Sequence, residues 1–333
     1  MEDRLEAALL RWECRNPRTL KGDAGARQYF RVEHPHLGTA LLVLYPDADP
    51  LKTDDPYFDY RALQAYLDPV VRVPTTIQFC DEDRTMLVEY LGDTSLEDRL
   101  IHHPEEELRW AEEVGEQLAT WLGLLTEGAP SRAFFMLRKF DQEKFTFEWD
   151  YCRQNFFLDF LQKEPPRWLD RMMEDIHGAL EGRARFLAHR DFHVRNLLIH
   201  GDRLVTIDFQ DARKGAATYD LASILFDGYW DWSEEARTVI LGRVQEGLGW
   251  SEALVWEELN LSAIQRNLKA LGTFGHQLVH RKRCHFASAI PRTIRHLNGH
   301  FHRLRHGEGV LASEHWLRLA EKRLMKSTEG ETE

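Results

Sequence analysis

The sequence predicts an α+β fold in which a small β-rich region precedes a larger, mostly helical one. Short runs rich in β-branched and aromatic residues fill most of the first 91 residues, a pattern typical of strands. From Leu96 onward, apolar residues recur almost everywhere at helical spacing. We therefore expect a β-rich lobe over residues 1–91 and a helical lobe over 92–333, with the hinge near Glu89 to Asp93.

The first lobe is expected to contain strands within four runs, residues 21–32, 39–45, 75–80 and 84–91. One helix interrupts them at residues 57–67. Pro56 suits its first turn, because the missing N–H of proline has no helical partner there.

The second lobe is expected to begin with a long helix that opens at Pro104 and ends near Gly128. Glutamates follow Pro104, where they lie at the positive end of the helix dipole. Further helices are predicted over residues 141–163, 166–180, 218–227, 234–247, 252–280 and 290–305. Strands break this helical pattern once, at residues 186–211.

Composition and charge exclude several classes of protein. The chain has 333 residues, of which 43% are apolar and 29% charged, as in a soluble globular protein. With 43 basic and 55 acidic residues it carries a net charge of -12, which disfavours a nucleic-acid partner. The 4 cysteines lie far apart and are expected to be reduced. No secretion signal or membrane span stands out, so we expect a cytoplasmic protein, and a monomer.

The most informative segment is FLAHRDFHVRNLLIHGDRLVTIDFQDA, residues 186–212. Two apolar runs flank residues 201–203, which predicts a hairpin with a three-residue loop. That register places Asn196 directly opposite Asp208. An amide oxygen and a carboxylate suit Mg²⁺, which takes few protein oxygens and leaves its other positions to water and phosphate.

Asp191 lies five residues before Asn196, on the loop that enters the hairpin. Phosphoryl transfer requires a metal that neutralises phosphate oxygens and a free carboxylate that aligns the acceptor hydroxyl and takes its proton. The alternative is coincidence, since HxDxxxxN is a loose pattern of common loop residues. The symmetry of the hairpin and the Ile-Asp-Phe that closes it favour a phosphotransfer site.

HRDFHVRN, IDFQDA and TYDLAS resemble the catalytic loop, metal-binding loop and following helix of the aminoglycoside phosphotransferase and choline kinase superfamily. GDAGARQYFR, EYLGD and IQRNLKALGTF further resemble the anomeric kinases of N-acetylmuramate and N-acetylglucosamine. The resemblance implies a protein-kinase-like bilobal fold. It also implies transfer from ATP, with Mg²⁺, to the anomeric hydroxyl of an N-acetylated amino sugar, giving a sugar 1-phosphate in cell-wall recycling.

The resemblance also implies roles for single residues. Asp191 would be the catalytic base, Asn196 and Asp208 would bind Mg²⁺, and Asp220 would anchor the catalytic loop. The residues assigned to the nucleotide are Gly22, Asp23, Arg27, Arg31, Glu89 and Leu91, the last two through backbone hydrogen bonds to adenine. The residues assigned to the substrate are Glu148, His193 and Arg266.

The sequence also departs from the kinase pattern. Protein kinases carry a phosphate-binding lysine on the third strand, paired with a helix glutamate. Neither is evident here, a gap that the amino-sugar kinases share. Arg27 or Arg31 would then serve the phosphates, although a solvated strand arginine is the more usual interpretation. Gly25 stands in place of a serine and Tyr45 in place of an acidic residue, so sugar choice and phosphate handling stay open.

Several residues keep two interpretations. His193 would brace the catalytic loop by hydrogen bonding, with acid–base catalysis as the alternative. Arg266 lies on one helix with Gln265 and Lys269, and these side chains would either reach an anionic group of the ligands or form structural salt bridges. Histidines at 296, 300, 302 and 306 have metal-like spacing, but a solvated basic helix end is the simpler interpretation.

Two rival functions remain on the sequence alone. A kinase for a cationic acceptor, such as an aminoglycoside or choline, would need a carboxylate-rich cleft around Glu148, whereas an anionic sugar would need nearby arginine or lysine. A kinase for a different sugar belongs to the same rival class. A nucleotide-binding pseudokinase is the second rival, since the strand lysine is missing.

Overall fold

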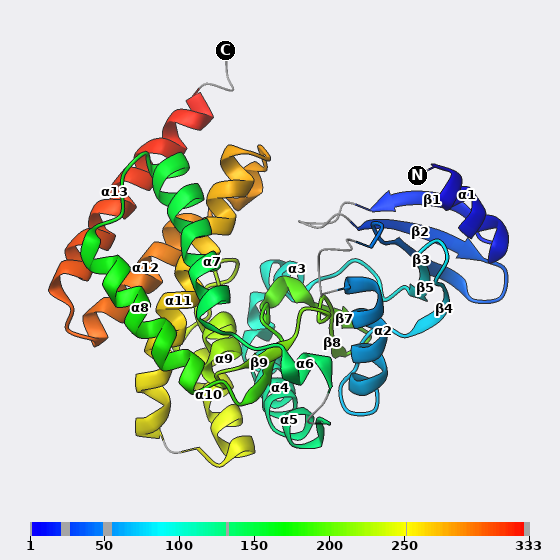
Figure 1. Cartoon of the computed structure of the whole chain (residues 1–333), viewed down its shortest axis with the longest axis horizontal. Coiled ribbons are helices and arrows are strands. Elements are labelled where there is room, and N and C mark those ends of the chain that lie inside the picture. Colours follow the sequence, from blue (N-terminus) through cyan, green and yellow to red (C-terminus); the bar gives the residue numbers. More distant parts are fainter. Residues whose placement is uncertain (1, 21–26, 49–54, 131–132, 251, 330–333) are drawn as a thin grey trace. The chain divides into compact units, whose positions relative to one another are not determined.

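The computed structural model describes residues 2–20, 27–48, 55–130, 133–250 and 252–329 (Figure 1). The chain divides into two compact units. The first comprises Met1–Leu96 and Asn196–Asp211, and the second comprises Glu97–Arg195 and Ala212–Glu333. An antiparallel sheet dominates the first unit and helices dominate the second, which confirms the predicted α+β class. The functional division into lobes at residue 91 stays a prediction.

The first unit is built on a five-stranded antiparallel sheet with the strand order β1-β2-β3-β5-β4. These strands are β1 (Arg15–Leu20), β2 (Gln28–His34), β3 (Gly38–Leu44), β4 (Thr76–Cys80) and β5 (Thr85–Glu89). The unit also contains α1 (Glu2–Arg11), α2 (Pro56–Leu67) and a separate hairpin of β7 (Leu197–His200) and β8 (Arg203–Thr206). Side chains of α1, β2 and β3 share one apolar core.

The helix predicted at residues 57–67 is confirmed as α2. Asp55 caps it, because its side chain accepts a hydrogen bond from the Tyr57 N–H at 3.1 Å. Neither α1 nor β1 was expected, although the residues of α1 are good helix formers. The edge strand β1 is almost fully exposed, contains Pro17, and holds Asn16 at a φ of 52°. It therefore lacks the apolar alternation by which strands are recognised.

The second unit consists mainly of helices (Figure 1). They are α3 (Leu96–His102), which starts on the last residue of the first unit, α4 (Glu107–Leu122), α5 (Leu124–Gly128), α6 (Phe134–Leu137), α7 (Gln142–Cys152), α8 (Arg167–Gly182), α9 (Thr218–Leu225), α10 (Glu234–Leu248), α11 (Glu252–Val279), α12 (Ala289–Arg303) and α13 (Gly307–Glu329). Two short strands, β6 (Phe186–Ala188) and β9 (Arg213–Gly215), pair with each other. The long α11 packs against α7, α8, α9 and α12.

Two of the predicted helices differ from the structure, and α13 was not predicted. The helix expected from Pro104 to Gly128 is divided into a 3₁₀ turn, α4 and α5. The helix expected over 141–163 is α7 followed by a π-helix (Arg153–Leu161), which ends at Gln162 in a left-handed conformation. No helix among the described residues is both long and apolar enough to cross a membrane.

Glycines bring α11 close to α7 and the π-helix. A Cβ on Gly272 would lie 2.7 Å from the Cα of Cys152, and one on Gly275 would lie 2.5 Å from the carbonyl oxygen of Asn155. Because backbone cannot move away as a flexible side chain would, larger residues do not fit there. The glycines of α11 thus set its distance from α7 and the π-helix, and α7 and α11 both contribute side chains to the polar cluster described next.

Candidate active site

The loop that carries Asp191 is anchored at its start by a buried carboxylate. Asp220 of α9 accepts hydrogen bonds from the N–H groups of His189 (2.6 Å) and Arg190 (2.9 Å), as the resemblance implies. Arg190 has a φ of 86°, which is rare for a residue with a side chain. Asp220 stabilises this strained turn, and the turn sets the direction of Asp191.

A second buried carboxylate holds the far end of the same loop. Asp227 accepts hydrogen bonds from the N–H groups of Val194 (3.0 Å) and Tyr229 (2.8 Å). Burial raises the pKa of Asp220 and of Asp227 to about 7, against the effect of these hydrogen bonds. Sequence reasoning missed Asp227, because no spacing rule connects it to a loop more than thirty residues earlier.

We expect Asp220→Ala to destabilise the second unit by about 3 kcal/mol, because two buried N–H groups would lose their acceptor. Equilibrium unfolding in urea measures this loss. Asp231→Ala is the matched control: its ion pair with Arg237 is largely exposed and is worth less than about 1 kcal/mol. Equal stability of the two variants would contradict the anchoring role.

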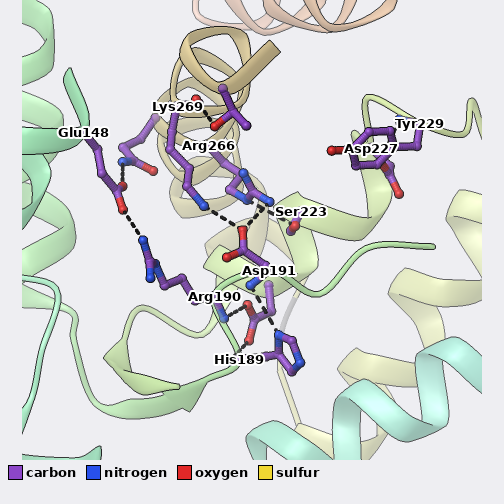
Figure 2. A network of polar contacts seen from close by, with 12 residues as sticks. Glu148, His189, Arg190, Asp191, Ser223, Asp227, Tyr229, Arg266 and Lys269 are labelled. Carbon is purple, nitrogen blue, oxygen red and sulfur yellow. Dashed lines mark hydrogen bonds and ion pairs between the residues drawn. The ribbon is translucent and has the colours of Figure 1, made fainter. Parts of the chain in front are cut away.

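Asp191 lies between two cations from α11. Its Oδ1 atom is 2.6 Å from Lys269 Nζ and 3.0 Å from a terminal nitrogen of Arg266 (Figure 2). The Nε of Arg266 donates in turn to Ser223 Oγ at 3.2 Å. Burial alone would raise the pKa of Asp191, but Lys269, Arg266 and Arg190 outweigh it and hold that pKa well below its ordinary value.

Glu148 connects α7 to the same cluster. Its side chain is 3% exposed, and one carboxylate oxygen accepts a hydrogen bond from Gln265 Nε2 at 2.8 Å. The other oxygen lies 3.5 Å from Arg190 and 3.9 Å from Lys144. Burial opposes the charge of Glu148, yet Lys269, Arg190 and Lys144 lower its pKa. The structure therefore brings Glu148, Arg266 and Asp191 into one network, and it places Arg266 in an ion pair with Asp191.

The ring of His193 makes a packing contact, but its Nδ1 atom makes no hydrogen bond to any residue that the structure describes. Its ring lies 5.1 Å from the ring of Tyr229, edge to face, and within the described residues Nδ1 has no hydrogen-bond partner. Burial lowers the pKa of His193 to about 3, although Asp191 opposes the shift. A histidine that stays neutral at physiological pH is suited to filling space beside Asp191 more than to donating a proton.

In the first unit, the hairpin register differs from the prediction. Leu197 pairs with Thr206 and His200 pairs with Arg203, so the turn contains two residues instead of three. Gly201 has a φ of 66°, which two-residue hairpin turns require and which glycine adopts at little cost. The expected direct opposition of Asn196 and Asp208 is therefore wrong by one residue.

Asn196 instead faces Ile207, whose N–H donates to the Asn196 carbonyl at 3.0 Å. Asp208 follows directly, at a φ of 60°. Its Oδ1 accepts hydrogen bonds from Arg27 (2.7 Å) and from Gln210 Nε2 (2.9 Å). An amide oxygen and a partly exposed carboxylate on neighbouring positions of one hairpin remain a donor set that fits Mg²⁺.

The residues assigned to the nucleotide are two arginines, the pair Gly22 and Asp23, and the pair Glu89 and Leu91. Arg27 is 18% exposed and paired with Asp208, so the interpretation as a solvated strand arginine is wrong for it. Arg31 lies 5.1 Å from the ring centroid of Tyr90, as in a cation–π contact. Gly22 and Asp23 lie outside the described residues.

Strand β5 ends at Glu89, and Leu91 lies two residues beyond it. The Glu89 carboxylate accepts hydrogen bonds from Arg72 (2.5 Å) and from the Thr75 N–H (3.2 Å). The carbonyl of Leu91 lies 3.3 Å from Nδ1 of His200. The Glu89 side chain is thus engaged within the unit, consistent with a backbone role for this residue.

The histidines of α12 are solvated only in part: His302 at its end is exposed as expected, whereas His296 and His300 are not. His300 is fully buried, with its Nδ1 atom 3.0 Å from the side-chain oxygen of Asn260 and its ring 4.3 Å from Phe226. The side chain of His296 is only 11% exposed. Apolar packing of α12 against α11 buries these rings, and periodicity alone did not show that this face of α12 points inward.

A five-stranded antiparallel sheet in one unit and a mostly helical second unit are features of the protein-kinase-like fold. A family model described as "Phosphotransferase enzyme family" (APH) matches residues 17–261, and the chain belongs to that family. The chain is thus an enzyme, a phosphotransferase with a hydroxyl group as acceptor. The resemblance identified from the catalytic motifs is confirmed.

A curated relative, the N-acetylmuramate/N-acetylglucosamine kinase of Neisseria meningitidis serogroup B, is 27% identical over 289 residues, covering 83% of this chain and 82% of the relative. The solved structure of a microcompartment-associated aminopropanol kinase aligns with a TM-score of 0.63 and 17% identity, covering 90% of this chain and 98% of that one. The ADP-bound structure of aminoglycoside phosphotransferase APH(2'')-Ib aligns with a TM-score of 0.59 and 14% identity, covering 88% and 97%. At these identities the two structures establish the fold alone.

Proposed function

We propose that the chain is an ATP-dependent kinase that phosphorylates the anomeric hydroxyl of N-acetylmuramate or N-acetylglucosamine, producing the sugar 1-phosphate and ADP. A role in cell-wall recycling belongs to the same proposal, because these sugars are released from peptidoglycan. The name of the curated relative supports the substrate class. The observation that carries the proposal is the charge of the side chains around Asp191 and Glu148.

Asp191 and Glu148 are outnumbered by their cationic partners. Those partners are Lys144, Arg190, Arg266 and Lys269. The cluster therefore carries more positive than negative charge, which favours a neutral or anionic acceptor over a cationic one. N-acetylglucosamine is neutral and N-acetylmuramate carries a lactyl carboxylate, whereas choline and the aminoglycosides are cations.

In this proposal Asp191 is the catalytic base. The acceptor hydroxyl donates a hydrogen bond to the Asp191 carboxylate and passes its proton there as the new O–P bond forms. The bond between the γ-phosphorus and the bridging oxygen breaks, and its electron pair leaves with ADP. The low pKa of Asp191 keeps the carboxylate ionised and is compatible with this role, because the transition state is loose and depends on alignment more than on basicity.

The substrate-side residues would act mostly through Asp191. Glu148 is too buried to offer much surface to a sugar, so we assign it the role of holding Gln265 and Arg190 in place. Arg266 would fix the orientation of the Asp191 carboxylate. His193 would pack beside them as a neutral ring.

The nucleotide would be bound by residues of the first unit. Asn196 and Asp208 would hold Mg²⁺, which neutralises phosphate oxygens when bound. Arg27, a cation next to Asp208, would serve the phosphates in place of the missing strand lysine. The backbone groups of Glu89 and Leu91 would bind adenine.

The proposal is tested by measuring ADP release with Mg²⁺-ATP and a panel of acceptors: N-acetylmuramate, N-acetylglucosamine, glucose, choline and kanamycin. We expect release with the two N-acetylated sugars. Release that depends on choline or kanamycin would assign the chain to the rival kinases, and release that depends on glucose alone would assign it to another sugar. Nucleotide binding without turnover on any acceptor would identify a pseudokinase.

A further inference from the structure

Lys269 belongs to the cluster and has no role in the reaction described so far. Lys269 lies on α11, one helical turn after Gln265 and Arg266. Its Nζ is the cation nearest to Asp191, at 2.6 Å, and its side chain is 12% exposed. An ammonium buried to this extent pays a high desolvation cost, so a purely structural explanation requires Asp191 and Glu148 to offset that cost.

Arg266 already neutralises Asp191. It contacts the same Oδ1 atom at 3.0 Å, and its Nε is independently fixed by Ser223. A carboxylate with one fixed guanidinium partner is compensated, so Lys269 adds a second positive charge to a site that already has one. The flexible side chain of lysine also allows its ammonium to move. The planar guanidinium of Arg266 cannot move in this way, because Ser223 holds it.

The geometry points to Lys269 as a catalytic cation that contacts the phosphoryl group during its transfer, while Arg266 holds Asp191 in place. This inference rests on the proposed function, since it assumes that Asp191 receives the acceptor hydroxyl. Because Oδ1 of Asp191 already contacts Lys269 and Arg266, a hydroxyl hydrogen-bonded to Oδ2 of the same carboxylate would lie within roughly 7 Å of Lys269 Nζ. That hydroxyl oxygen is the atom to which the new O–P bond forms, so the ammonium would face the negative charge of the phosphoryl group.

The charged groups that face Lys269 decide its protonation. Asp191 and Arg190 face it from the catalytic loop, Glu148 from α7 and Arg266 from its own helix. Burial and Arg266 lower the pKa of Lys269 to about 8, although Asp191 raises it. The ammonium is therefore mostly charged at neutral pH and loses its proton as the pH rises through about 8.

Lys269→Met and Lys269→Arg test the inference in the full-length chain. We expect Lys269→Met to lower kcat by about 100-fold, with the KM of the acceptor nearly unchanged, since the contact forms in the transition state. Lys269→Arg should recover at least a tenth of the wild-type kcat. The wild-type kcat should fall as the pH rises through about 8, and Lys269→Arg should not show this fall, because a guanidinium stays charged.

Lys139→Met is the matched control, since Lys139 pairs with Glu181 at the surface of the same unit. A thermal melt of each variant separates catalysis from folding. If Lys269→Met is folded and its kcat stays within threefold of wild type, the inference is overturned and Lys269 is a structural partner of Asp191. The same holds if Lys269→Arg keeps the alkaline fall. The assays use whichever acceptor the wild-type enzyme phosphorylates, so a wild type inactive on amino sugars overturns the proposed function and leaves this test intact.

Discussion

Asp191→Asn is expected to lower kcat for sugar phosphorylation by about a thousandfold, while the KM of the sugar changes less than threefold. An asparagine side chain keeps the shape of Asp191 and still accepts hydrogen bonds from Arg266 and Lys269. It lacks the negative oxygen that takes the proton of the acceptor hydroxyl. Steady-state kinetics with Mg²⁺-ATP and N-acetylmuramate measure both constants.

The control for this variant is Asp202→Asn, which makes the same chemical change in the exposed turn of the β7–β8 hairpin. It should retain wild-type kinetics. Asp191→Asn also leaves Arg266 and Lys269 facing a neutral group, so its melting temperature should fall by a few degrees. If Asp191→Asn retains at least a tenth of the wild-type kcat, Asp191 is not the catalytic base.

Asp208→Asn is expected to lower kcat/KM for Mg²⁺-ATP by at least about 100-fold. The amide offers one neutral oxygen where the carboxylate offers a charge, so the affinity for the divalent ion falls. Binding of Mn²⁺-ADP, followed by the loss of the free Mn²⁺ electron paramagnetic resonance signal, reports this change without turnover.

Arg27→Met separates metal binding from phosphate binding. It removes the cation that pairs with Asp208 but leaves both proposed metal ligands, Asn196 and Asp208, in place. Mn²⁺-ADP should bind to this variant within about tenfold of wild type, whereas Asp208→Asn should bind it far more weakly. Equal Mn²⁺-ADP affinity of Asp208→Asn and the wild type would exclude Asp208 as a metal ligand.

The order of elements was largely predictable from sequence, because apolar periodicity reports which side chains are buried. Helix α2 is an example, with Asp55 and Pro56 marking its start. The failures have physical causes. The hairpin register depends on one residue of turn length, and Gly201 permits the shorter turn. The edge strand β1 is polar and twisted at Asn16, so it has no periodic signal.

The candidate site was predictable only where its residues are close in sequence. Asp191, Asn196 and Asp208 lie within one segment, so their spacing carries information. The partners of Asp191 are distant in sequence, because Lys269 and Arg266 reach it from α11, which begins 61 residues later at Glu252. From the sequence alone, these two cations could therefore either contact an anionic ligand or form salt bridges. The structure pairs both with Asp191.

The buried carboxylates show the same limit. That Glu148 lies near the substrate stays a prediction, and its contacts with Gln265 and Arg190 were not expected from the sequence. Asp227 was not singled out at all, although it holds the loop of Asp191 through Val194. Such anchoring depends on which backbone N–H groups are left without partners in the folded chain, and sequence spacing does not report this.

The central claim is that this chain transfers a phosphoryl group to an anomeric hydroxyl with Asp191 as base. It is tested most directly by ³¹P nuclear magnetic resonance of the full-length enzyme with Mg²⁺-ATP and N-acetylmuramate. We predict that ADP appears together with a phosphate monoester whose phosphorus couples to the anomeric proton, and that Asp191→Asn forms neither. Formation of ADP with inorganic phosphate alone, or of a monoester coupled to a proton elsewhere on the sugar, would contradict the claim.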